Sequence, residues 1–110
     1  MNEISKRDIQ NLKQKTDEIK ESLNIDSRKE VLKSLESESS NPNLWKDKKH
    51  AQEVLTQISQ IQEEVKKIES IEEEISTLMS LADEQNTSDE QFIEEEYKRI
   101  EERIKEFELI

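Results

Sequence analysis

The sequence predicts an all-α protein, an elongated antiparallel helical bundle or coiled coil with one very long helix. Apolar residues recur at alternating steps of three and four, the spacing that keeps side chains on one face of a helix. The 110 residues include no glycine and one proline, so little interrupts this spacing. Only 30% of the residues are hydrophobic and 41% are charged, which favours a thin apolar seam over a thick core. So high a charged fraction is also typical of disordered chains, but a disordered chain would not sustain the spacing across separate segments.

The first two helices are predicted from two short apolar stripes. The stripe of the first helix ends at Leu23 and contains Ile9, Leu12, Thr16, Ile19 and Leu23. Asn24-Ile25-Asp26 is expected to interrupt it. Ser27 followed three residues later by Glu30 forms a capping-box pattern, so a short second helix is expected to begin there. The apolar side of this helix would contain Val31, Leu32 and Leu35.

A polar loop is predicted over residues 37–43, because serine and asparagine side chains compete with helical hydrogen bonds. Pro42 must end the preceding helix, since proline lacks a backbone donor and restricts Asn41. Trp45, the only tryptophan, follows this turn and is expected to plug the end of the bundle core. The substitution Trp45→Ala would then lower stability by roughly 3 to 5 kcal/mol.

A third helix is predicted over residues 47–82, on the order of 50 Å long at the α-helical rise per residue. Its stripe contains Ala51, Val54, Leu55, Ile58, Ile61, Val65, Ile68, Ile71, Ile75, Leu78, Met79 and Ala82. Ile71 comes one place early for a strict heptad, so a local adjustment of the seam is expected near residues 72–74.

A fourth helix is predicted to run nearly to the C-terminus, with Ser88 and Gln91 as a second capping box. Its stripe contains Ile93, Tyr97, Ile100, Ile104 and Phe107, and both aromatic residues are expected to pack in the core. The short connection from the third helix favours an antiparallel hairpin. The first two helices can cover the rest of the long helix, so residues 1–110 are predicted to form a single helical domain.

Charge and composition exclude several classes of function. The formal charge of −11 argues against direct nucleic-acid binding and favours a basic protein surface as partner. No apolar run is long enough to span a membrane, and the first residues lack the pattern of a secretory signal. The absence of cysteine is compatible with a cytoplasmic protein.

No catalytic apparatus is predicted, so the chain is not expected to be an enzyme and no catalytic, cofactor or metal residue is assigned. Without glycine there is no phosphate-binding loop, and His50 is the only histidine. His50 is expected to be an ordinary surface or boundary residue. The runs Glu72-Glu73-Glu74 and Glu94-Glu95-Glu96 could hold a divalent ion, but consecutive helical residues point in different directions, which favours a solvated face.

The order of these elements resembles the N-terminal domain of bacterial peptide chain release factor 2. In that family a proline, a short spacer and a tryptophan are followed by an alanine-glutamine pair, as Pro42, Trp45 and Ala51-Gln52 are here. The stretch Leu78-Met79-Ser80-Leu81-Ala82, the acidic loop after it and the ending Phe107-Glu108-Leu109 are also similar. The sister release factor lacks this proline-tryptophan pattern.

The resemblance implies a ribosome-docking module of a factor that directs translation termination at UAA and UGA. The family reads these codons through a Ser-Pro-Phe tripeptide and promotes hydrolysis through a Gly-Gly-Gln motif. Neither motif occurs in these 110 residues, so the codon-reading and catalytic regions would lie beyond Ile110. The implied partners are proteins of the ribosomal stalk base and the GTPase that recycles release factors, with the domain itself a monomer.

Two other functions fit the stripes. One is a self-associating coiled-coil scaffold, and the other is the helical-hairpin arm of a tRNA synthetase, which the acidic charge disfavours. The predicted architecture and the family resemblance both require that Trp45 is buried and that the helix over residues 47–82 is unbroken.

Overall fold

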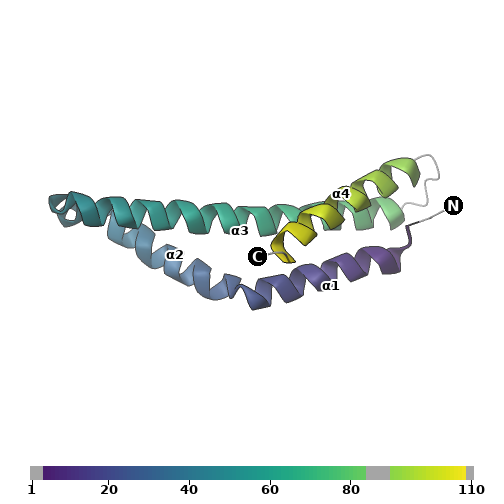
Figure 1. The fold of residues 1–110 in the computed structure, drawn as a ribbon, viewed down its shortest axis with the longest axis horizontal. Coiled ribbons are helices and arrows are strands. Elements are labelled where there is room, and N and C mark those ends of the chain that lie inside the picture. Colours follow the sequence, from purple (N-terminus) through teal and green to yellow (C-terminus); the bar gives the residue numbers. More distant parts are fainter. Residues whose placement is uncertain (1–3, 84–89, 109–110) are drawn as a thin grey trace. The chain divides into compact units, whose positions relative to one another are not determined.

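The computed structural model describes residues 4–83 and 90–108, which are helical almost throughout (Figure 1). In chain order they form α1 (Lys6–Ser22), α2 (Ile25–Ser39), the short 3-10 helix η1 (Pro42–Lys46), α3 (Lys48–Asp83) and α4 (Glu90–Glu108). Within these ranges no residue lies in a strand. The predicted all-α class is confirmed, and so is the very long helix, since α3 continues for 36 residues.

The chain divides into two compact units that share α3. One contains Met1–Ser22 and Ile68–Ile110, and the other contains Leu23–Lys67. The division falls inside α3, so the N-terminal part of this helix packs in one unit and the C-terminal part in the other. The prediction of one domain over residues 1–110 stays a prediction.

In the first unit, α1 and α4 both run antiparallel to the C-terminal part of α3. Lys6 forms an ion pair with Asp83, whereas Lys20, farther along α1, pairs with the earlier Glu72. Buried residues of all three helices form one core: Ile9, Leu12, Ile71, Ile75, Leu78, Ile93, Ile100 and Ile104. The predicted hairpin of the last two helices is therefore confirmed. Tyr97 and Phe107 pack against this core, as predicted, while remaining partly exposed.

In the second unit, α2 and η1 cover the N-terminal part of α3. Leu44, Ala51 and Val54 are buried together, with Leu35 and Ile58 packed against them. Two residues assigned to apolar stripes are instead exposed, because they lie off the packed faces: Val31 is 49% exposed and Leu55 is 42% exposed.

The seam of α3 shifts where one unit ends and the other begins. Val65, Ile68 and Ile71 are all buried, although they are separated by two successive steps of three. Two such steps turn the buried stripe around the helix axis relative to a heptad pattern. The helix accommodates this without a break, and residues 72–74 remain α-helical.

The first helix begins with a cap for which no prediction was made. Ser5 and Asp8 cap α1 reciprocally: the Ser5 amide donates to Asp8 Oδ2 (2.9 Å) and the Asp8 amide donates to Ser5 Oγ (3.2 Å). The Ser5 hydroxyl also donates to Asp8 Oδ2 (3.0 Å), and the bonds that the Ser5 amide and hydroxyl donate to this carboxylate lower the pKa of Asp8. This Ser-x-x-Asp pattern was readable in the sequence.

The capping box predicted at Ser27 and Glu30 is wrong, because α2 begins at Ile25 and Ser27 lies inside it. Asn24 turns the chain instead, with φ of 52°, a left-handed conformation that asparagine tolerates. This turn allows the side chain of Ile25 to be buried at once, at 1% exposure. The other predicted cap, at Ser88, lies outside the described residues.

Candidate interaction surface

The turn between α2 and α3 is closed by its own hydrogen bonds. Asn41 Oδ1 accepts from the Asn43 amide (2.9 Å), and the Leu44 amide donates to the Asn41 carbonyl (3.1 Å). Pro42 occupies the first position of η1, where its missing N–H leaves no donor unpaired. The Asp47 amide then donates to the Leu44 carbonyl (3.1 Å). The turn is thus held by the residues that also end the preceding helix.

Leu44, and not Trp45, fills the core beside this turn. Leu44 is 7% exposed and packs on Ala51 and Val54, whereas Trp45 is 54% exposed. Successive residues of a 3-10 helix point about 120° apart, so the side chain after a buried one is directed away from the core. The prediction that Trp45 plugs the bundle is therefore wrong.

The architecture and the family resemblance were expected to require a buried Trp45. Because Trp45 is exposed, this expectation is wrong. The helices form with the indole in solvent, because the apolar contacts of this unit come from Leu44 and its neighbours. The second condition, an unbroken long helix, is met by α3.

His50 is exposed, as predicted, and it also links α3 to the end of α2. Its Nε2 lies 2.7 Å from Glu38 Oε1, and its Nδ1 lies 4.0 Å from Glu53 Oε2. Its backbone amide donates to Asp47 Oδ1 (3.1 Å), which caps α3. The hydrogen bond with Glu38 raises the pKa of His50 above its ordinary value of 6.5. His50 and Glu38 are twelve residues apart in different helices, so the spacing of residues within one helix could not predict this pair.

We expect the melting temperature to fall slightly as pH rises through the raised pKa of His50. A pKa that is higher in the folded state than in the unfolded state contributes to the free energy of unfolding. This contribution is complete below about pH 6.5 and is lost as the folded imidazole deprotonates. Because the pair is exposed, added salt should weaken the effect. Thermal unfolding followed by circular dichroism from pH 5 to 9 measures it, and the difference between the chain and His50→Gln isolates this group. Identical profiles for the two proteins would contradict the assignment, and Glu38→Gln should behave like His50→Gln.

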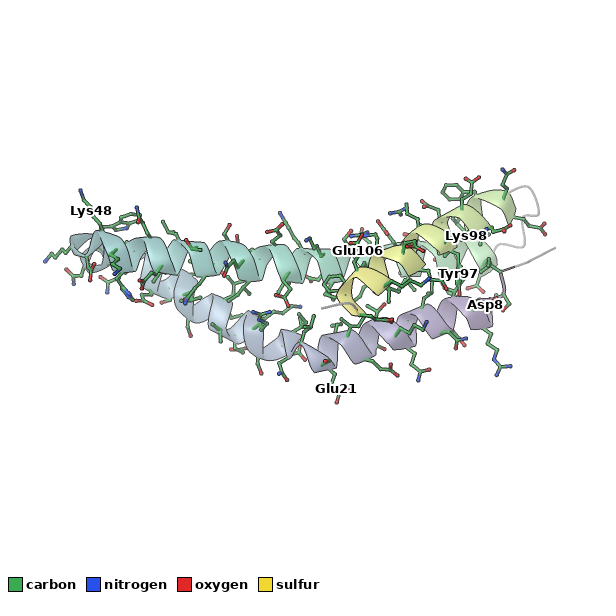
Figure 2. The ribbon with its side chains drawn as sticks, viewed as in Figure 1. Asp8, Glu21, Lys48, Tyr97, Lys98 and Glu106 are labelled. Atoms are coloured by element: carbon green, nitrogen blue, oxygen red, sulfur yellow. The ribbon has the colours of Figure 1, made fainter. Side chains whose placement is uncertain are left out.

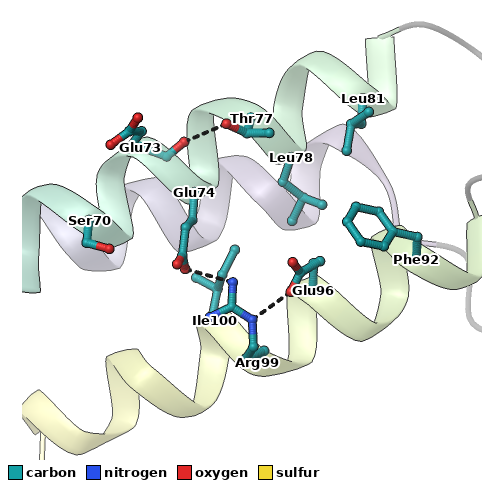
Figure 3. A pocket seen from close by; sticks show the side chains of 10 residues that line it. All are labelled: Ser70, Glu73, Glu74, Thr77, Leu78, Leu81, Phe92, Glu96, Arg99 and Ile100. Atoms are coloured by element: carbon teal, nitrogen blue, oxygen red, sulfur yellow. Dashed lines mark hydrogen bonds and ion pairs between the residues drawn. The ribbon is translucent and has the colours of Figure 1, made fainter.

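An ion-pair cluster joins α3 to α4 (Figure 3). Glu74 Oε2 lies 3.1 Å from Arg99 Nη2, the pair drawn in the figure. Glu74 Oε1 lies 2.8 Å from Arg103 Nη1. Arg99 also donates from Nε to Glu96 Oε2 at 2.6 Å, and this bond is the main reason that the pKa of Arg99 is raised. Glu74 thus pairs with two guanidinium groups at a partly buried position, and Glu96 supplies the second negative charge of the cluster.

The prediction that both glutamate runs form solvated faces is correct only in part. Glu73 is exposed, but its neighbours Glu72 and Glu74 pair with α1 and α4, respectively. Consecutive residues do point in different directions, and here two of those directions face another helix. The sequence alone could not identify these partners, because they are distant along the chain.

We expect Glu74→Gln to lower the free energy of unfolding by about 1 to 2 kcal/mol, because a partly buried, doubly paired carboxylate would be lost. The matched control is Glu94→Gln, since among residues 4–83 and 90–108 the ion pair of Glu94 is with Lys98, one turn away at 3.2 Å. The control should cost no more than about 0.5 kcal/mol. Urea unfolding of both variants gives the comparison, and equal losses would show that the cluster is no stronger than a surface pair.

The described residues of the first unit line grooves on two sides of α3. One, of about 290 Å³, is bounded by the Glu74 cluster and by the exposed ring of Phe92 beside Leu78 and Leu81 (Figure 3). The other, of about 530 Å³, lies between α1 and α3, with Lys13, Thr16, Glu72 and Met79 among its lining residues. Thr16 is buried and satisfied, since its hydroxyl donates to the Leu12 carbonyl (2.8 Å). Neither groove gathers the nucleophile, base and oxyanion donors that a hydrolytic centre requires.

Charged side chains cover the outer faces of the helices, as Glu21, Lys98 and Glu106 illustrate (Figure 2). Over residues 4–83 and 90–108, no three acidic, histidine or cysteine side chains lie close enough to hold a metal ion. None of the described helices is both long and apolar enough to cross a bilayer. The chemistry available on these surfaces is that of charge pairing and of a few exposed apolar groups.

Comparison with known proteins adds one finding. The family model of the PCRF domain matches residues 28–110. No curated protein and no solved structure matches the chain. The matched segment contains most of α2 and all of η1, α3 and α4, and it therefore includes the turn with Trp45 and the ion-pair cluster.

Proposed function

Because the chain belongs to the PCRF domain family, a domain of peptide chain release factors, we propose that it is the N-terminal domain of a bacterial class I factor acting at UAA and UGA. The match over residues 28–110 is the observation that carries this proposal. The PCRF domain is a non-catalytic helical domain of release factors, so peptide release itself would be performed by other parts of the factor.

The assignment to factor 2 is supported by the turn between α2 and α3. Pro42, Trp45 and Ala51-Gln52 follow the pattern of that family, and the structure gives two of these positions a local role. Pro42 begins η1, and Ala51 is fully buried against Leu44. Trp45 itself has no packing role that would explain the pattern.

Codon choice is tested with the complete reading frame that encodes this chain. We expect its translation downstream of Ile110 to contain Gly-Gly-Gln and Ser-Pro-Phe, and the purified product to release peptide at UAA and UGA but not at UAG. Release at UAG without release at UGA would assign the chain to the sister factor. Loss of the downstream motifs altogether would overturn the role in termination.

For docking, we propose that exposed acidic side chains contact a basic protein at the ribosomal stalk base in the cytoplasm. The formal charge of −11 supports this choice of partner, as do the exposed glutamates of α4. The same acidic surface could be presented to the GTPase that recycles release factors.

Co-sedimentation with ribosomes tests the docking proposal. The variant Glu95→Gln, Glu102→Gln, Glu106→Gln removes three exposed charges of α4 and should weaken binding, chiefly through slower association. A matched variant with three exposed acids of α1 changed, Asp17→Asn, Glu18→Gln and Glu21→Gln, shows whether the α4 positions matter beyond net charge. Binding that is insensitive to salt and to both variants would contradict electrostatic docking.

The isolated chain is expected to be a monomer, because most of its stripe residues are already buried against one another. Sedimentation equilibrium should return a mass near 13.1 kDa over a wide range of concentrations. A mass that rises with concentration would favour the self-associating scaffold. The PCRF match favours a release factor over the synthetase arm.

A further inference from the structure

The exposed indole of Trp45 is followed along the chain by three lysines without ion pairs among the described residues. Trp45 is 54% exposed, and Lys46, Lys48 and Lys49 next to it are exposed as well. None of these lysines takes part in an ion pair with the described residues. Figure 2 shows Lys48 at the start of α3, extending away from the ribbon. We call these four residues the Trp45 patch.

The backbone that carries the indole of Trp45 is held in place, although the indole is not part of the core. Hydrogen bonds within residues 41–47 fix the backbone on which it stands, and Leu44 anchors that backbone in the core. The link between His50 and Glu38 closes the turn from the other side. A rigid aromatic group loses little conformational freedom on binding, so its contact area converts efficiently into affinity.

We propose that the Trp45 patch binds an unpaired stretch of RNA, with a base stacked on the indole and the lysines on adjacent phosphates. An exposed aromatic ring flanked by cations is the arrangement by which proteins bind single strands, since every base has a flat face and every nucleotide a charge. An acidic protein segment would use the lysines but offer no planar group to the indole. RNA satisfies both halves of the patch.

The expectation of no nucleic-acid contact was based on the net charge of the whole chain, whereas binding at the Trp45 patch depends on the charges around it. At physiological ionic strength, charges act over roughly 8 Å, so a phosphate at the patch responds mainly to the groups around it. Three acids near the patch are directed toward His50: Asp47 accepts from the His50 amide, and Glu38 and Glu53 face the His50 ring. The inference uses the family only for its setting in translation, and it does not depend on codon choice or on acidic docking.

The test uses the fluorescence of the chain itself, because Trp45 is its only tryptophan. Titration with a short oligoadenylate that cannot pair should quench this emission through stacking. Binding should weaken as salt rises from about 50 to 200 mM, with a log-log slope of about −0.7 for each phosphate contacted. Poly-glutamate, an acidic polymer without bases, should leave the emission unchanged.

Variants locate the contacts, with binding followed by the anisotropy of a labelled oligoadenylate. Trp45→Leu should weaken binding about fivefold or more, whereas Phe92→Leu, which alters an aromatic ring that is 50% exposed elsewhere, should not. Lys48→Gln with Lys49→Gln should lower the salt slope by about 1.4. The control variant Lys33→Gln with Lys67→Gln changes the net charge by the same amount, but its two lysines pair with Glu30 and Glu63. It should change the affinity and the salt slope little.

Three results would overturn the inference: no quenching at low salt, equal losses from the two lysine pairs, or binding of poly-glutamate as strong as that of RNA. The last result would instead indicate an acidic protein partner. Far-ultraviolet circular dichroism of each variant checks that the helices are intact. A negative outcome would leave the proposed role in termination untouched, because that role is tested on the complete reading frame.

Discussion

Replacing Ile100 with alanine is expected to lower the free energy of unfolding by about 2 to 5 kcal/mol, the cost of a cavity in a packed core. Ile100 is 1% exposed and lies in the cluster that joins α1, α3 and α4. A chain with a core this thin has little reserve, so the variant is expected to be partly unfolded at ambient temperature. Urea unfolding followed by circular dichroism measures the loss.

Two controls show whether the loss comes from burial. Ile100→Val removes one methylene group and should cost about 0.5 to 1.5 kcal/mol, so the two variants form a graded series. Phe92→Ala removes a larger side chain that is 50% exposed, and it should cost less than Ile100→Ala. A larger effect at Phe92 than at Ile100 would contradict the packing of α4 described above.

Leu44→Ala is expected to destabilise the second unit by about 2 to 5 kcal/mol, because Leu44 supplies the buried contact of the turn. Trp45→Ala, one residue later, should change stability by no more than about 0.5 kcal/mol. This order reverses the prediction from sequence, in which the tryptophan was the buried group. The indole is exposed, so removing it leaves no cavity.

Thermal and urea unfolding of the two variants, followed by circular dichroism, distinguish the alternatives. In Leu44→Ala the fluorescence of Trp45 gives a second, local signal, since this residue lies in the same turn. If Trp45→Ala were the more damaging change, the turn would have to pack its indole and not Leu44. If both were neutral, the second unit would not depend on this turn.

The net charge of the chain does not show that basic side chains are concentrated at the start of α3. The chain as a whole carries a formal charge of −11, yet the Trp45 patch contains three lysines without ion pairs among the described residues. Acidic side chains of α4 and the basic patch at the start of α3 therefore suit partners of opposite charge. The proposed docking on a basic protein and the proposed contact with RNA therefore use different residues of the chain.

The sequence by itself determined the helices and their approximate ends. The spacing of Ile93, Ile100 and Ile104 predicts one buried face, and the structure buries all three. Pro42 ends the second helix because its chemistry acts on adjacent residues, whatever the rest of the chain does. The family could also be inferred, because the order of helices and turn residues is written along the chain.

The tertiary structure is needed to tell which of two adjacent apolar residues enters the core, and which acidic side chains form ion pairs with another helix. Leu44 and Trp45 are equally suited to burial, and the 3-10 turn allows only one of them to face α3. Glu73 and Glu74 are identical in sequence terms, yet Glu74 alone meets Arg99 and Arg103. Both choices depend on contacts between different helices, and the spacing of residues within one helix carries no information about those contacts.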